Sequence, residues 1–146
     1  MADQIKCNVL LVDDEVQFLD ALSQRLEIRG LSVDTVKDGE EALAKIDEKP
    51  FDAIVLDLAM PGIDGIETLR LLKEKQPDLQ IIMLTGHATV KSGIDAMKMG
   101  AEDFLEKPLD LNVLLEKLTQ AKNKTMLLVE KSRQEEVRKI IKSKSW

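Results

Sequence analysis

The chain has 146 residues, which is long enough for one domain with a buried core but short for two. Hydrophobic residues make up 44% and charged residues 33%, a balance that excludes an intrinsically disordered protein. The net charge of −6 conceals an acidic body and a basic tail. Residues 1–115 carry 12 basic and 23 acidic side chains, whereas residues 116–146 carry nine and four.

Two further features of the composition bear on where the protein works. Cys7 is the single cysteine, so no internal disulfide can form, and its place at the start of an apolar run favours a small core residue. No apolar stretch approaches the roughly 18 residues needed to span a bilayer, and the N-terminus lacks a secretory signal. We therefore expect a soluble cytoplasmic protein that binds no membrane.

Strand-like and helix-like patterns alternate from Cys7 to about Lys122. The expected strands are five short aliphatic or β-branched runs: Val9–Val12, Ser32–Val36, Ala53–Leu56, Ile81–Leu84 and Asp103–Leu105. The expected helices are the amphipathic segments between them: Val16–Arg29, Glu40–Asp47 behind an Asp38 cap, Ile66–Lys75 and Val90–Met99. This alternation predicts an α/β fold in which helices cover both faces of a parallel sheet.

The composition of the runs predicts their order in the sheet. The first, third and fourth runs are apolar throughout, as buried central strands are, whereas the second and fifth contain polar residues that suit the edges. Right-handed crossovers then favour a doubly wound, flavodoxin-like sheet of five strands in the order 2-1-3-4-5. Its switch point would lie between the first and third strands.

The C-terminal segment differs from the rest of the chain. From Asp110 to Trp146 it contains neither Gly nor Pro, so we expect an extended C-terminal helix that runs past the sheet. Whether this helix is continuous around Asn123–Thr125 is left open. We assign residues 1–122 to the α/β domain and residues 123–146 to a basic helical extension.

Five polar residues lie just past four of the apolar runs: Asp13, Asp14, Asp57, Thr85 and Lys107. Because the carboxyl ends of parallel strands meet at one edge of a sheet, we expect three carboxylates, a hydroxyl and an ammonium to converge there. Adjacent carboxylates repel each other, and a divalent cation that prefers oxygen ligands, such as Mg²⁺, would neutralise them. Beside such a cation, Asp57 could act as a nucleophile and form an acyl phosphate.

Each of these residues also has a simpler interpretation. The Asp13-Asp14 pair could cap the helix that follows it, and Asp57 could be a turn residue. Thr85 could reflect strand propensity alone, and most lysines are simply solvated. Residues of all the required types at four strand ends, in this order, favour a shared site over coincidence.

Four motifs carry a resemblance to a known family: Val9-Leu-Leu-Val-Asp-Asp-Glu15, Ile54-Val-Leu-Asp-Leu-Ala-Met-Pro-Gly-Ile-Asp-Gly65, Leu84-Thr-Gly-His87 and Gly100-Ala-Glu-Asp-Phe-Leu-Glu-Lys-Pro108. Over about residues 6–122, the chain resembles the response-regulator receiver domains of two-component signalling. The resemblance implies a phosphoacceptor in a phosphorelay, not an enzyme. The phosphoryl group would come from a sensor histidine kinase or a histidine phosphotransfer protein.

The resemblance assigns the central chemistry to a few residues. Asp57 would accept the phosphoryl group. Asp13 and Asp14 would hold Mg²⁺ together with Asp57, and the backbone carbonyl of Ala59 would complete the metal site.

The resemblance also implies a switch. Thr85 and Lys107 would contact the phosphoryl oxygens, and movement of Thr85 would let an aromatic residue on the fifth strand turn inward. Phe104 occupies that position, where the family often has Tyr. A phosphorylation-dependent protein partner, or a second copy of the chain in a homodimer, would then recognise the changed face.

Three other classes of protein agree less well with the sequence. A phosphatase of the haloacid dehalogenase type would need a second Asp two positions after the nucleophile, where this chain has Ala59. A flavodoxin-like electron carrier would need aromatic side chains around a flavin, yet aromatics make up only 3% of the chain. The sequence also has no Gly-x-Gly-x-x-Gly motif that would indicate a dinucleotide.

Two hypotheses remain for the output. In the first, the chain is a stand-alone receiver whose C-terminal helix is a surface for a partner or a second copy. In the second, it is the receiver and linker of a larger transcriptional regulator, because residues 86–101 resemble receivers attached to ATPase-type transcription activators. Some two dozen residues follow Lys122, too few for a DNA-binding domain, so we expect no direct binding of nucleic acid.

Overall fold

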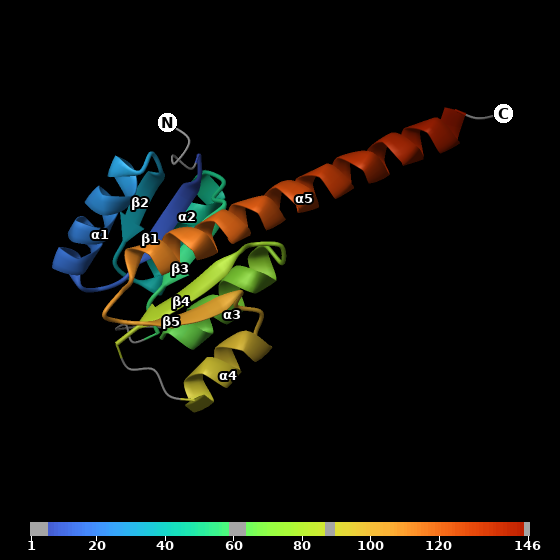
Figure 1. Ribbon diagram of the computed structural model, residues 1–146. Helices are drawn as coiled ribbons and strands as arrows, with labels where there is room; N and C mark the ends of the chain where they lie inside the picture. Colours follow the sequence, from blue (N-terminus) through green and yellow to red (C-terminus); the bar gives the residue numbers. More distant parts are fainter. Residues whose placement is uncertain (1–5, 59–63, 87–89, 145–146) are drawn as a thin grey trace.

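The computed structural model describes residues 6–58, 64–86 and 90–144 and contains a five-stranded sheet. The strands are β1 Asn8–Val12, β2 Ser32–Val36, β3 Ala53–Leu56, β4 Ile81–Thr85 and β5 Asp103–Glu106. All neighbouring strands are parallel, and their order is β2-β1-β3-β4-β5 (Figure 1). The predicted fold and strand order are confirmed, and each end of a predicted strand lies within about one residue of the observed end.

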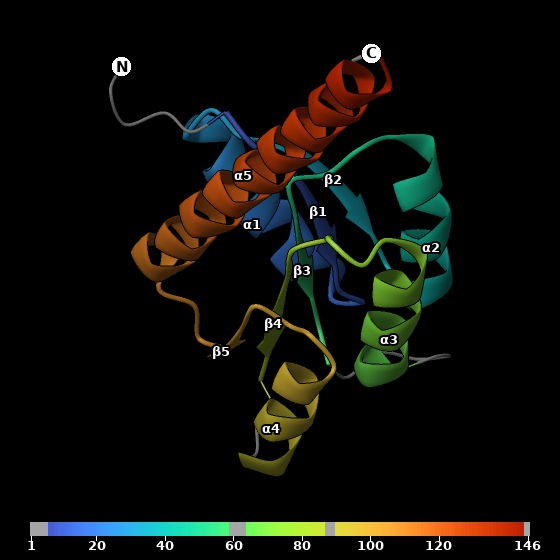
Figure 2. The same ribbon diagram turned by 90° about the vertical axis from the view of Figure 1, so that its right-hand side faces the viewer.

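Helices connect and cover the strands: α1 Val16–Ile28, α2 Gly39–Glu48, α3 Gly65–Lys75, α4 Val90–Lys98 and α5 Leu111–Lys144. Helices α1 and α5 lie on one face of the sheet, and α2, α3 and α4 lie on the other (Figure 2). The predicted cap of α2 is confirmed, because the Asp38 side chain accepts a hydrogen bond from the Glu41 backbone N–H at 2.8 Å. Such a cap satisfies a donor at the helix start and contributes about 1 kcal/mol.

Side chains that alternate along the strands build one core on each face of the sheet. In β1, Leu10 and Val12 pack under α2, α3 and α4, whereas Val9 and Leu11 pack under α1 and α5. The helices supply Ala42, Ile46, Leu69, Leu72 and Ala96 to the first core and Leu19, Leu22, Leu26, Leu114, Leu115, Leu118 and Ala121 to the second. Each buried Leu contributes about 1.5–3 kcal/mol. Burial on both faces therefore holds the ends of β1, β3 and β4 side by side.

Helix α5 is a single helix of 34 residues, and it continues through Asn123–Thr125. At 1.5 Å per residue it is about 50 Å long. Its buried positions end at Ala121, and every described side chain from Val129 to Ser143 is exposed, so the helix projects from the body (Figure 1). The proposed division at residue 122 falls inside this helix and stays a prediction. Among the described helices, none combines the length and the apolar character that crossing a membrane requires.

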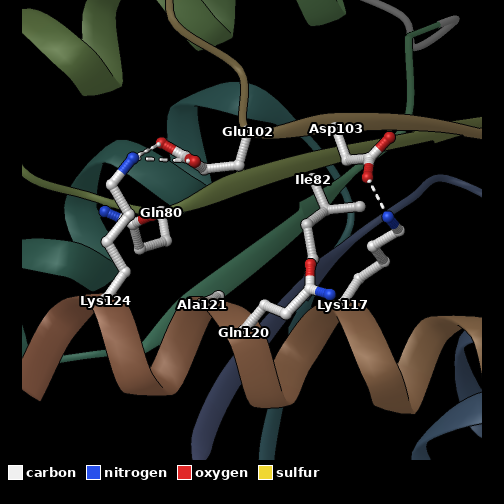
Figure 3. A pocket seen from close by; sticks show the side chains of 8 residues that line it. All are labelled: Gln80, Ile82, Glu102, Asp103, Lys117, Gln120, Ala121 and Lys124. Carbon is white, nitrogen blue, oxygen red and sulfur yellow. Dashed lines mark hydrogen bonds and ion pairs between the residues drawn. The ribbon is translucent and has the colours of Figure 1, made fainter.

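Two ion pairs tie α5 to the start of β5 and to the residue just before it, across a groove of about 240 Å³ (Figure 3). The Lys117 Nζ lies 2.8 Å from Asp103 Oδ2, and the Lys124 Nζ lies 2.9 Å from both carboxylate oxygens of Glu102. Gln80 also lines this groove, and its buried side-chain oxygen has no hydrogen-bond partner within the described part of the chain. The ion pairs hold the packed part of α5 against the edge strand.

Candidate functional site

Four of the predicted site residues lie at the carboxyl-terminal edge of the sheet. Asp13, Asp57 and Lys107 directly follow β1, β3 and β5, and Thr85 is the last residue of β4. Backbone hydrogen bonds extend the sheet to this edge: the Asp57 N–H donates to the Val12 carbonyl, and the Lys107 N–H donates to the Thr85 carbonyl, both at 2.9 Å. The parallel register therefore brings together residues that are far apart in the sequence.

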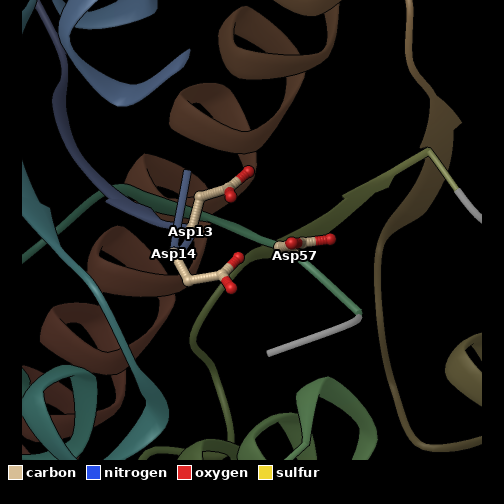
Figure 4. Close-up of side chains that lie close together, drawn as sticks. All are labelled: Asp13, Asp14 and Asp57. Carbon is tan, nitrogen blue, oxygen red and sulfur yellow. The ribbon is translucent and has the colours of Figure 1, made fainter. Parts of the chain in front are cut away.

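Asp13, Asp14 and Asp57 form an acidic cluster (Figure 4). Each offers one carboxylate oxygen, and these three oxygens lie within 4.8 Å of one another. Asp13 and Asp57 are 3% and 5% exposed, whereas Asp14 is exposed to solvent. Negative charges this close repel each other strongly when they are buried. A donor set made only of oxygens, with one member open to solvent, suits a hard divalent cation such as Mg²⁺.

Lys107 brings a positive charge to the acidic cluster. Its Nζ lies 2.8 Å from Asp13 Oδ2, 3.0 Å from Glu15 Oε1 and 4.1 Å from the centre of the Phe18 ring. Burial by itself would lower the pKa of Lys107, but the hydrogen bonds to Asp13 and Glu15, with the nearby charge of Asp57, outweigh it and raise the pKa. The side chain is only 14% exposed. The interpretation of Lys107 as an ordinary solvated lysine is therefore wrong.

The structure argues against the interpretation of Asp13-Asp14 as a helix cap. The residue at the cap position of α1 is Glu15, and its side chain makes no capping hydrogen bond. Asp13 Oδ1 accepts a hydrogen bond from the Glu15 N–H at 2.9 Å, just before the helix, and Asp13 Oδ2 binds Lys107. Asp14 contributes its carboxylate to the acidic cluster (Figure 4).

Gly65 allows a close approach of the chain behind Asp57. A Cβ atom on Gly65 would lie 2.4 Å from both the Asp57 carbonyl oxygen and the Leu58 Cα atom. The Gly65 N–H donates to the Leu58 carbonyl at 2.8 Å, which fixes the start of α3 against the end of β3. A larger residue at this position would have to displace the backbone that carries Asp57.

The two predicted switch residues lie on neighbouring strands. Thr85 is fully buried at the end of β4. Phe104 in β5 is half-buried and packs with the core under α4, where a Cβ atom on Gly93 would lie 3.9 Å from its ring. Phe104 therefore packs toward α4. The predicted metal ligand Ala59, and His87 of the third motif, lie outside the described residues.

Sequence reasoning missed Glu15 and Phe18 as members of the site. Both contact Lys107, which lies 92 positions after Glu15 in the chain. Their one sequence signal is proximity to the Asp13-Asp14 pair, because Glu15 follows it directly and Phe18 lies about one helical turn later. The contacts themselves depend on the direction of the Lys107 side chain, which no local pattern reveals.

Comparisons with known proteins agree with this geometry. Residues 9–119 match the family model described as response regulator receiver domain. The chain is 42% identical over 123 residues to the C4-dicarboxylate transport transcriptional regulatory protein DctD of Pseudomonas aeruginosa, a match that covers 84% of this chain and 26% of that protein. It is 38% identical over 116 residues to the transcriptional regulatory protein ZraR of Salmonella typhimurium, covering 80% and 26%. The chain thus spans about a quarter of the length of these relatives.

Solved structures share the same fold. A response regulator receiver domain protein from Clostridium thermocellum is 34% identical with a TM-score of 0.80, and the match covers 84% of this chain and 98% of that one. A response regulator protein from Burkholderia pseudomallei was solved with a phosphorylated aspartic acid, a calcium ion and citrate. It is 30% identical with a TM-score of 0.74, and the match covers 88% of this chain and 75% of that one.

Proposed function

Because this chain belongs to the response regulator receiver family of two-component signalling, we propose that Asp57 accepts a phosphoryl group from a sensor histidine kinase or a histidine phosphotransfer protein. The observation that carries the proposal is the acidic cluster with Lys107 bound at its side. The solved relative that holds a phosphorylated aspartic acid and a calcium ion supports both the acceptor and a divalent cation. The acceptor is part of the chain itself, so we propose a phosphoacceptor and not an enzyme.

In the proposed reaction, a carboxylate oxygen of Asp57 attacks the phosphorus atom of a phosphohistidine. The new O–P bond forms as the P–N bond breaks, and the leaving imidazole nitrogen keeps the electron pair. Phosphoryl transfer depends on positioning and on neutralising negative charge. Lys107 supplies a positive charge that is held in place by its neighbours, and the Thr85 hydroxyl donates a hydrogen bond to a phosphoryl oxygen.

We assign the cation site to Asp13, Asp14 and Asp57, with the carbonyl of Ala59 as a further ligand. Mg²⁺ bound there would neutralise the carboxylates and the incoming phosphoryl oxygens. The all-oxygen donor set supports this assignment, and the exposure of Asp14 leaves the site open to water and to the phosphoryl donor.

For the output, we infer that phosphorylation changes the face formed by α4, β5 and α5. A phosphoryl group adds about 1.5 to 2 negative charges next to the end of β4, and Thr85 would shift toward it. The Phe104 ring, packed against α4 beside Gly93, could then change its position. A protein partner would recognise the new arrangement. The relatives DctD and ZraR are transcriptional regulatory proteins, which favours control of a transcriptional output over a stand-alone receiver.

The acceptor is tested by incubating the protein with Mg²⁺ and acetyl phosphate and measuring the intact mass. The wild type is expected to gain one phosphoryl group and Asp57→Asn none, and chelation of Mg²⁺ should reduce wild-type labelling to the level of Asp57→Asn. Asp20→Asn, which alters an exposed carboxylate on α1, is the matched control and should label like the wild type. Equal labelling of Asp57→Asn and the wild type would refute the assignment.

A further inference from the structure

Glu15 touches the site through Lys107, yet it belongs neither to the acidic cluster nor to the residues assigned to phosphoryl transfer. Its Oε1 lies 3.0 Å from the Lys107 Nζ. The same Nζ lies 2.8 Å from Asp13 Oδ2 and 4.1 Å from the centre of the Phe18 ring. An ammonium group has three N–H donors. The neighbours of the Lys107 ammonium are thus two carboxylates, which accept hydrogen bonds from it, and one aromatic face.

The two carboxylates differ in how readily they release Lys107. The Asp13 side chain is 4% exposed, whereas the Glu15 side chain is 64% exposed. A buried carboxylate that loses its lysine is left without compensation, which is costly. An exposed carboxylate regains water, so its ion pair contributes little. The bond from Lys107 to Glu15 is thus the one that yields when another anion approaches.

We propose that Glu15 is a positioning residue that holds Lys107 back from Asp57 until a phosphoryl group displaces it, and that Glu15 thereby slows phosphorylation. The inference rests on the proposed function, because it requires a phosphoryl group on Asp57. Lys107 exchanges one oxygen partner for another: its hydrogen bond to Glu15 breaks, a hydrogen bond to a phosphoryl oxygen forms, and no proton is transferred. The released Glu15 carboxylate is left in solvent at the start of α1.

The test is a double-mutant cycle on the initial rate of labelling by acetyl phosphate with Mg²⁺. Glu15→Gln removes the charge but keeps the length of the side chain, and it is expected to label about two- to fivefold faster than the wild type, the range for a part-exposed ion pair. In a Lys107→Ala background the same substitution should not alter the rate, because the lysine through which it acts is gone. Asp20→Asn on α1, the helix that begins directly after Glu15, is the control for the loss of one negative charge.

Two results of the cycle would overturn the inference. Equal rates for Glu15→Gln and the wild type would show that Glu15 does not restrain Lys107. Equal acceleration with and without Lys107 would show that Glu15 merely repels the anionic donor. If the wild type takes up no phosphoryl group at Asp57, the proposed function fails instead, so the two failures are distinguishable.

A second measurement does not require Lys107→Ala to fold. Glu15→Gln is expected to change the ¹⁵N chemical shift of the Lys107 ammonium in the unphosphorylated protein but to leave it unchanged in the phosphorylated protein. A change of the same size in both states would mean that the contact persists, which contradicts displacement by the phosphoryl group.

Discussion

Two buried aspartates at opposite ends of the sheet hold lysines in similar ways. Asp13, just after β1, binds Lys107 at 2.8 Å, and Asp52, just before β3, binds Lys122 at 3.0 Å. Each aspartate also accepts a hydrogen bond from a backbone N–H, at 2.9 and 2.8 Å respectively. Since each lysine comes from a distant part of the chain, both pairs connect elements that the sequence separates.

The two ends differ in the balance of charge. At Asp52 one carboxylate meets one ammonium, and the Thr125 hydroxyl donates to the Asp52 carbonyl at 3.1 Å. At Asp13 the ammonium is shared with Glu15, and the acidic cluster adds two further carboxylates. Paired charges compensate the cost of burial, whereas an excess of like charge lowers stability unless a cation is bound. The balance of charge, more than burial or a lysine partner, therefore distinguishes a binding site from a structural anchor.

We call the Asp52–Lys122 ion pair the anchor, and the largest expected effect on stability is there. Asp52→Ala leaves the half-buried Lys122 ammonium and the Asn8 N–H without their partner, so we expect the free energy of unfolding to fall by about 2–3 kcal/mol. Urea denaturation measures this loss. Asp47→Ala on α2 removes an exposed partner of Lys75 and is the matched control, with an expected cost below about 1 kcal/mol. Equal costs for the two substitutions would show that Asp52 is not an anchor.

The anchor also carries a pH dependence through Cys7. Burial, with a further contribution from the negative charge of Asp52 and an opposing one from Lys122, raises the pKa of the Cys7 thiol from 9.0 to about 12. Above about pH 9 the unfolded thiol loses its proton while the folded one keeps it. Stability should therefore fall as the pH rises from about 9 toward 12, by up to about 1.4 kcal/mol per pH unit.

Urea denaturation at several alkaline pH values checks this expectation, with Cys7→Ala as the reference. The variant lacks the thiol but keeps the lysines, whose titration also affects alkaline stability. The wild type should therefore lose stability more steeply than Cys7→Ala over this range. Parallel curves would mean that the thiol ionises equally in both states.

The position of the acidic cluster could be predicted from the sequence because it depends on the backbone alone. Short apolar runs that end beside Asp13, Asp57 and Thr85 define strand ends, and a parallel sheet brings such ends to one edge regardless of side-chain direction. The long helix α5 could be predicted for a similar reason, because a segment without Gly or Pro has no residue that compels it to stop.

The balance of charge could not be predicted, because it depends on side-chain contacts across long separations in sequence. No local pattern pairs Lys107 with Glu15, or Lys122 with Asp52, which lies 70 positions earlier. The continuity of α5 around Asn123–Thr125 could not be predicted either, because it also involves a contact with a distant part of the chain. The Thr125 hydroxyl bonds both the Ala121 carbonyl within the helix and the Asp52 carbonyl outside it, and the second of these contacts exists only in the folded protein.

Asp14→Asn tests the excess of charge at the opposite end from the anchor. It removes one negative charge from the acidic cluster at its exposed member, so in the presence of a chelator we expect the free energy of unfolding to rise by about 1 kcal/mol. Mg²⁺ is expected to raise the thermal midpoint of the wild type more than that of the variant, because the ligand set is weakened. Asp20→Asn should change neither quantity. A loss of stability in Asp14→Asn would show that repulsion does not govern this end of the sheet.

The smallest expected effect on stability concerns the end of α5. Because every described side chain beyond Leu128 is exposed, deletion of residues 132–146 should change the free energy of unfolding by less than about 0.5 kcal/mol. Deletion of residues 124–146 also removes the Lys124–Glu102 ion pair and the Thr125 hydrogen bonds, so it should cost about 1 kcal/mol more.

Both deletions are expected to leave phosphorylation intact, because α5 leaves the body near Asp52, at the end of the sheet opposite the acidic cluster. Both should weaken self-association or partner binding, because they remove the exposed apolar side chains of Val137, Ile140 and Ile141. Analytical ultracentrifugation of the three lengths, with and without phosphorylation, measures self-association, and a pull-down with each form measures partner binding. If the shorter deletion retains both interactions while the longer one loses them, the surface lies between residues 124 and 131, next to the anchor, and not on the projecting end of the helix.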